Sequence, residues 1–382
     1  MTRVPVQPTL FTWARQRARL DEAVLAARFP HLAEWEAGEV QPTLHQLEQY
    51  AQATHAPLGY FFLPAPPQEA VPIPDFRTLG LGVPRLSADL LDVIYTCQAR
   101  QTWYRDEALV HGETPLPYIG SVTMATPPAD AAESIRRQLG FSVQARRQCP
   151  TWTEALRLFI AQAEQAGVMV MVSGVVMNNN KRHLDPQEFR GFALADGIAP
   201  LVFINGADSK AAQMFTLAHE LAHLWLGQTA LSDAALPAGS DHATEMWCNR
   251  VAAELLVPQA EFSAALLPDE ALDLALQRLA RHFKVSTLVL LRRMLDVGWL
   301  DREAFWGAYR AEEARLNAMA ARSAGGGDFY RSTVARVSKR FAQTLVASTL
   351  EGRTLYRDAF RMLGIAKPGT FNELGRTLGF PT

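Results

Sequence analysis

The chain has 382 residues, with 37 Lys/Arg, 39 Asp/Glu and a formal net charge of −2, and 48% of its residues are hydrophobic. This length predicts two or three domains, and the composition is that of a folded soluble protein, which excludes disordered and membrane-embedded classes. No apolar run reaches the roughly 18 residues that cross a bilayer, and the three cysteines form no CxxC pair. With no secretory-type apolar region at the start, we expect a cytoplasmic protein with no membrane partner.

The first 63 residues predict a helical module. Asp21 precedes an apolar-periodic stretch, EAVLAARF, as a helix-capping residue would, and PTLHQLEQYAQAT repeats apolar positions at helical spacing. Residues 64–84 contain six prolines, a density that blocks regular helix and predicts a linker.

Residues 85–112 and 128–166 are again predicted to be helical, and strand chemistry follows. The segments VMVMVSGVVM (168–177) and GFALADGIAPLVFIN (191–205) are rich in Val, Ile and Phe and are interrupted by Gly and Pro. Two interpretations of 191–205 are open: an exposed sheet edge that pairs with an extended substrate, or an ordinary hairpin inside the core.

The next helix carries the strongest chemical signal. It is predicted to begin at Asp208 or Ser209 and to end at Gly227, and it contains His219-Glu220-Leu221-Ala222-His223. Residues four apart lie on one helix face, so both imidazoles can reach one metal ion, while Glu220 is placed to hold a water. This pattern predicts a Zn²⁺ site in which Glu220 is the general base.

Two histidines do not complete a catalytic zinc site, which usually has three protein ligands. In the extended motif HExxHxxGxxH, Leu226 stands where the glycine would lie and Thr229 where the third histidine would lie, so this source of a third ligand is excluded. The helix HATEMWCNRVAAELLVP offers Glu245 and Glu254 as third-ligand candidates. Its periodicity and the place of Glu245 near the helix N-terminus favour Glu245 without excluding Glu254. Weaker candidates precede it: Asp233 and Asp241 as ligands, and His242 as a supporting residue.

The last third of the chain is predicted to be helical, apart from ARSAGGGD (321–328), and it is basic. Residues 271–382 hold 18 Lys/Arg against 10 Asp/Glu. These charges are either a solvated helix surface or a nucleic-acid footprint. Any nucleic acid is therefore expected to bind through 271–382, which includes the pair Arg292-Arg293 and the cluster Arg336, Lys339 and Arg340.

The segments FTLAHELAHLWLG and ExxCNRVAAELLVP resemble the ImmA/IrrE family of zinc metallopeptidases. The resemblance is strong over residues 190–260 and looser over 85–300. It implies an α+β fold, mostly helical, in which a small mixed sheet and the HExxH helix form a minimal thermolysin-like peptidase domain (85–300) between helical regions. It also implies that His219, His223 and Glu245 bind Zn²⁺ and that Glu220 is catalytic. None of His183, Arg190 and Lys210 is singled out as a transition-state stabiliser.

The N-terminal segment WEAGEVQPTLHQLEQYAQATHAPLGYFFLP is similar to the Xre-type helix-turn-helix module that is often fused to these peptidases, and PDFRTLG resembles the stretch that connects them. Only PHLAE (30–34) stands between the first helix and the WE-x-G element, and HLAEWEAGE has three glutamates and no Arg or Lys. Such a segment repels phosphates and lacks the usual donors for base readout, so this module is predicted to be degenerate.

The resemblance implies a regulatory endopeptidase that cuts a specific partner protein such as a repressor or an antitoxin. The alternative from a different class is a DNA-binding transcriptional regulator that uses a peptidase-like domain as a sensor. The sequence predicts four regions: the helix-turn-helix-like module (1–63), the linker (64–84), the peptidase domain (85–300) and a helical C-terminal region (301–382).

Overall fold

The computed structural model describes residues 3–67, 69, 73, 86–232, 242–322 and 329–381. These residues fall into two compact units, the first with 3–67, 69 and 86–95, and the second with 73 and everything from 96 onward. Most of the predicted linker, the candidates Asp233 and Asp241, the side chain of His242 and most of the ARSAGGGD break lie outside the described residues.

The first unit contains the predicted N-terminal helices. They are α1 (Pro8–Arg17), α2 (Glu22–Arg28), α3 (Leu32–Ala37), α4 (Leu44–Ala53) and the short 3₁₀ helix η1 (Leu58–Phe62). Asp21 caps α2 by accepting a hydrogen bond from the Ala23 amide, as its position in the sequence predicts. An aromatic cluster of Phe11, Phe29, Trp35, Tyr50 and Phe61 fills the centre of this unit, with ring centroids 5.3 to 6.0 Å apart.

The second unit is built around one small sheet. Its strands are β1 (Met169–Ser173), β2 (Gly191–Leu194), β3 (Leu201–Asn205) and β4 (Ala230–Ser232), in the order β1-β3-β2-β4. The pair β1–β3 is parallel and the pairs β2–β3 and β2–β4 are antiparallel, so the sheet is mixed. This confirms the predicted α+β class, mostly helical with a small mixed sheet.

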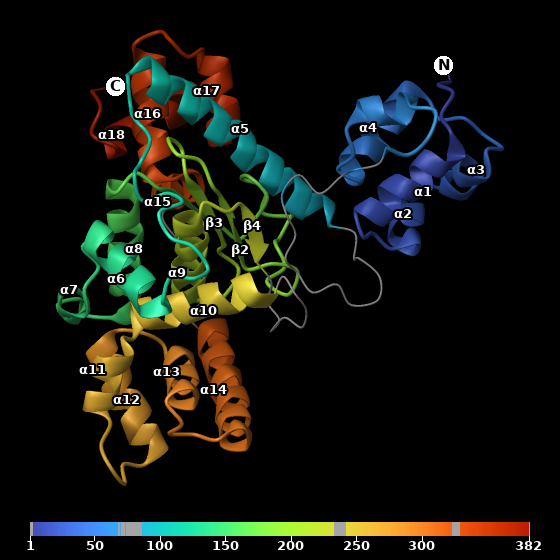
Figure 1. The fold of residues 1–382 in the computed structure, drawn as a ribbon. Helices are drawn as coiled ribbons and strands as arrows, with labels where there is room; N and C mark the ends of the chain where they lie inside the picture. The colour runs from blue at the N-terminus through green and yellow to red at the C-terminus, as the bar shows by residue number, and fades with distance from the viewer. Residues whose placement is uncertain are drawn as a thin grey trace. The chain divides into compact units, whose positions relative to one another are not determined.

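The remaining helices are, in chain order, α5 (Ala88–Val110), α6 (Pro128–Leu139), α7 (Val143–Arg147), α8 (Trp152–Gln165), α9 (Lys210–Leu226), α10 (His242–Leu256), α11 (Gln259–Ala265), α12 (Leu272–Phe283), α13 (Thr287–Asp296), α14 (Arg302–Arg322), α15 (Phe329–Val337), α16 (Lys339–Leu350), α17 (Tyr356–Leu363) and α18 (Pro368–Thr377). In Figure 1, α10 lies between α9 and the group α11–α14, and α15–α18 gather beside α5. Among the described helices, none combines the length and the apolar character that a membrane crossing requires.

The expected exposed edge at 191–205 is wrong, because this segment forms the two interior strands of the sheet. Both faces of the strands are covered, as side chains alternate between them. Val170, Val202 and Ile204 join the core that includes α9, whereas Met171 points to α5, where its sulfur lies 3.9 Å from the Cys97 sulfur. The interpretation as a core hairpin is therefore confirmed, and the two outer strands are β1 and β4.

One side of α5 carries a polar stripe that holds the C-terminal helices. The buried Arg100 donates two hydrogen bonds, of 3.0 and 2.8 Å, to the Met362 carbonyl oxygen near the end of α17. One turn further on, the Tyr104 hydroxyl accepts a 2.7 Å hydrogen bond from Arg340. These contacts, at helical spacing, tie α16 and α17 to the body of the unit.

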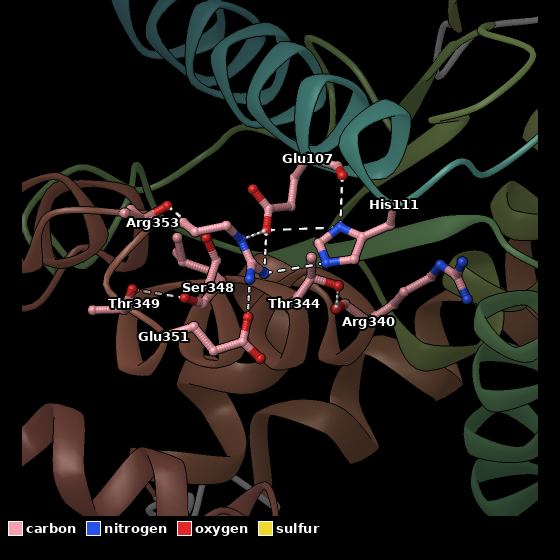
Figure 2. Close-up of polar contacts among 10 residues, drawn as sticks. Glu107, His111, Arg340, Thr344, Ser348, Thr349, Glu351 and Arg353 are labelled. Carbon is pink, nitrogen blue, oxygen red and sulfur yellow. Dashed lines mark hydrogen bonds and ion pairs between the residues drawn. The ribbon is translucent and has the colours of Figure 1, made fainter.

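The stripe continues in the polar cluster of Figure 2. Arg353 donates from Nε and Nη2 to one carboxylate oxygen of Glu107, at 2.9 and 2.7 Å, and its Nη2 lies 3.2 Å from Nε2 of His111. Glu351 pairs with the same guanidinium. Since α15 and α16 also pack against β1, the helices after residue 328 belong to the same compact unit as the sheet.

Candidate metal centre

Helix α9 presents the motif residues to the interior. Ser209 caps its first turn by accepting from the Ala212 amide, and Gly227 ends it in the left-handed conformation at φ +71°. The end of the helix is held from outside, because Gly120 and Val122 donate their amides to the Leu224 and Trp225 carbonyls at 3.1 Å. The helix is therefore fixed at both ends, with its middle turns buried.

His219, His223 and Glu245 converge, and all three are buried. Nε2 of His219 lies 3.1 Å from Nε2 of His223 and 3.1 Å from Oε2 of Glu245, and Nε2 of His223 lies 3.1 Å from Oε1 of Glu245. Ligands about 2.1 Å from a tetrahedral ion are separated by about 3.4 Å, so this spacing fits a zinc ion. Two imidazoles and a carboxylate are also a ligand set that zinc prefers.

The pKa values of these three side chains depend on their burial and on the charges and hydrogen bonds between them. Burial alone would raise the pKa of Glu245, but hydrogen bonds and charge from both histidines hold it well below its usual range. Burial lowers the pKa of both histidines. For His219 the hydrogen bonds and charges of Glu245 and its other neighbours together outweigh burial and raise the pKa, whereas for His223 burial, with repulsion by His219, leaves the pKa lowered despite the bond to Glu245. Glu245 is thus ionised, which is the form of a carboxylate that binds a metal ion.

Glu220 lies beside this cluster and is fully buried. Burial raises its pKa to about 8, with Glu245 adding to the rise and with His219 and Ser232 opposing it. Neither of its carboxylate oxygens has a hydrogen-bond partner of normal geometry among the described residues, although Ser232 of β4 is close enough to affect the pKa. A buried carboxyl without a partner is costly to the fold, which is a typical feature of a group kept for function.

Strand β2 passes directly over Glu220 at a glycine. A Cβ built on Gly191 would lie 2.5 Å from Cγ2 of Thr216, 2.8 Å from the Phe203 carbonyl oxygen and 3.2 Å from Oε1 of Glu220. The close approach of strand and helix therefore depends on the missing side chain.

We expect Gly191→Ala to lower the free energy of unfolding by about 1–3 kcal/mol, because the added methyl group overpacks this contact. Urea denaturation of the metal-free protein measures the change. Gly307→Ala is the matched control, since a Cβ at that helical position meets no atom within 4 Å. The control is expected to be neutral or to gain stability, and equal losses in both variants would contradict the assignment of a tight β2–α9 contact.

The other sequence candidates have different partners. The Glu254 carboxylate pairs with the buried Arg293 at 2.9 Å and accepts from the Gln259 amide, and it is absent from the cluster. Arg190 pairs with Asp208 at 3.5 Å, and Nζ of Lys210 donates to Gln213 at 3.1 Å.

His183 is exposed and its backbone bridges to that of Val175. No contact in the described part of the chain brings His183, Arg190 or Lys210 to the cluster of His219, His223 and Glu245.

The basic C-terminal residues are largely engaged within the protein. Ion pairs join Arg278 to Glu270, Arg292 to Asp296, Arg293 to Glu254, Arg315 to Glu312, Arg353 to Glu107 and Arg376 to Glu373. Arg336 donates to Asn178, and Arg340 to Tyr104. A guanidinium that is already paired with a carboxylate is less available to a phosphate, so these contacts do not support nucleic-acid binding by 271–382.

The N-terminal unit gives no support to the DNA-binding alternative either. The helix after the α2 turn, α3, has only six residues, Leu32–Ala37. Its acidic side chains are Glu34, which contacts His31, and Glu36, which pairs with Arg15 at 3.0 Å. A short acidic helix lacks the donors that read base edges.

Two family models match the sequence. Residues 337–377, which span α16 to α18, match a domain of unknown function, DUF8813. No curated protein matches the chain. Residues 163–295, from the end of α8 to α13, match the model described as the IrrE N-terminal-like domain, Peptidase_M78, which supports a peptidase function of the IrrE/ImmA kind for the domain that holds His219, His223 and Glu245.

Proposed function

We propose that the protein is a zinc-dependent endopeptidase of regulatory type, which cuts a specific partner protein such as a repressor or an antitoxin. The observation that carries the proposal is the convergence of two imidazoles and an ionised carboxylate beside a buried glutamate, whose carboxylate has no hydrogen bond of normal geometry within the described part of the chain. His219, His223 and Glu245 would hold the metal, and Glu220 would be the catalytic base.

A zinc ion at this site would act as a Lewis acid and lower the pKa of a water molecule to about 7. The protein supplies the proton transfer: Glu220, next to His219 along the helix, would accept the proton of the attacking water and later deliver it to the leaving amine. A nearby cation favours the charged form of a carboxyl, which counteracts the burial that raises the pKa of Glu220 in the metal-free site. The dry surroundings strengthen each of these interactions.

The restricted access to the site supports a selective enzyme. Of the four residues, Glu220 and His223 are fully buried, while His219 and Glu245 are only 5% and 6% exposed. A folded substrate surface could not reach ligands at such depth, so a substrate would have to present an extended segment. This requirement favours cleavage of a few partner proteins over general degradation.

The test compares the proteins cut in source cells that express either the native protein or Glu220→Gln. Labelling of new protein N-termini, followed by mass spectrometry, should reveal a small set of cleavage sites that only the native protein produces. Purified zinc-loaded protein should then cut the identified partner at the same bonds. Identical sets of N-termini in the two cell lines, together with no cleavage by the purified protein, would refute the proposal.

A further inference from the structure

Asn249 lies against the metal cluster and is not one of its ligands. Helix α10 places it one turn after Glu245, on the same face, so the helix that supplies the carboxylate also supplies this amide. Oδ1 of Asn249 is 3.0 Å from Nδ1 of His219. The other ring nitrogen of His219, Nε2, is the atom that faces Glu245 and His223.

This contact determines which nitrogen of His219 can bind a metal. An amide oxygen only accepts hydrogen bonds, so Nδ1 of His219 must carry the proton in the pair. A neutral imidazole has one N–H, which leaves the lone pair on Nε2, toward the cluster. We propose that Asn249 is a positioning residue that fixes the tautomer and the ring orientation of His219 for metal binding, an inference that rests on the proposed zinc site.

A neutral partner also suits the charge of the site. With a divalent cation bound, the carboxylates of Glu220 and Glu245 balance its two charges, and all of these groups are buried. A carboxylate at position 249 would accept the same hydrogen bond more strongly but would leave the buried site with a net negative charge. The amide therefore orients His219 without adding charge.

The experiment uses the full chain and measures zinc binding, which does not depend on cleavage. Asn249→Ala, Asn249→Asp and the control Arg250→Ala, an exposed neighbour on α10, are titrated with Zn²⁺ in competition with a chromogenic chelator. Asn249→Ala should bind zinc about 10- to 100-fold more weakly, and Asn249→Asp should recover native affinity or exceed it, because it restores the acceptor. Arg250→Ala should bind like the native protein.

A spectroscopic readout separates orientation from general damage to the fold. In the zinc-loaded native protein, NMR should show a slowly exchanging proton on Nδ1 of His219. In Asn249→Ala this proton should exchange faster, and in Asn249→Asp it should again exchange slowly. Native zinc affinity and an unchanged Nδ1 signal in Asn249→Ala would overturn the inference, as would a loss that Asn249→Asp does not recover. The proposed function fails differently, when the native protein binds zinc normally yet cuts no partner.

Discussion

Glu220→Gln is expected to reduce peptide cleavage by at least about 10²- to 10⁴-fold while the protein retains its zinc. The amide has nearly the shape of the carboxylate, but it cannot accept a proton from the attacking water. Because Glu220 has no hydrogen-bond partner of normal geometry among the described residues, the substitution should break no contact of the fold. Steady-state cleavage of the identified partner and elemental analysis of the same preparation give the two measurements.

The matched control is Glu261→Gln, which makes the same chemical change at an exposed position of α11. It should cleave at the native rate. The general-base assignment is wrong if Glu220→Gln and Glu261→Gln cleave equally well. A Glu220→Gln protein that has lost its zinc would instead show that this residue is a ligand.

The second prediction with a large expected effect is that substitution of a proposed ligand lowers the zinc content of the protein. His223→Ala and Glu245→Ala should each weaken zinc binding by more than the 10- to 100-fold expected for Asn249→Ala, because each removes a proposed ligand and Asn249 only supports one. Inductively coupled plasma mass spectrometry after dialysis measures the zinc content per chain, which should be close to one in the native protein.

Glu254→Ala distinguishes the two carboxylates that the sequence offers on the same helix. It breaks the pair with Arg293 and leaves that buried guanidinium without its carboxylate, so the protein should unfold at lower denaturant concentration. Its zinc content should stay native. A metal-poor Glu254→Ala protein alongside a zinc-replete Glu245→Ala protein would transfer the ligand role to Glu254.

The local features of the candidate site could be predicted from the sequence because they depend on neighbouring residues. The Ser209 cap, the Gly227 terminus and the shared face of His219 and His223 all follow from helix geometry. The third ligand required the fold, since Glu245 and Glu254 lie on one helix and only the packing of α10 against α9 decides which meets the histidines. The family resemblance had implied Glu245, and the geometry brings this residue to the cluster.

Two features of the structure could not be predicted from the sequence: the pairing of strand β4 and the partners of the basic residues after 271. Strand β4 has only three residues, Ala230–Ser232, and a segment that short has no detectable periodicity. Its pairing with β2 is what moves 191–194 from the edge of the sheet to the interior. The excess of basic residues after 271 is similarly ambiguous, because a partner such as Glu107, which pairs with Arg353, lies 246 residues earlier in the chain.

The packing of α15 and α16 against β1 also has a consequence for the order of folding. Strand β1, Met169–Ser173, is an outer strand, and two of the helices that pack against it, α15 and α16, begin only at Phe329, so their contacts close a loop of more than a hundred residues. During synthesis at about 5–20 residues per second, the outer strand waits several seconds for its cover. Nascent chains should therefore leave the surface of β1 that α15 and α16 cover exposed until these helices leave the ribosome.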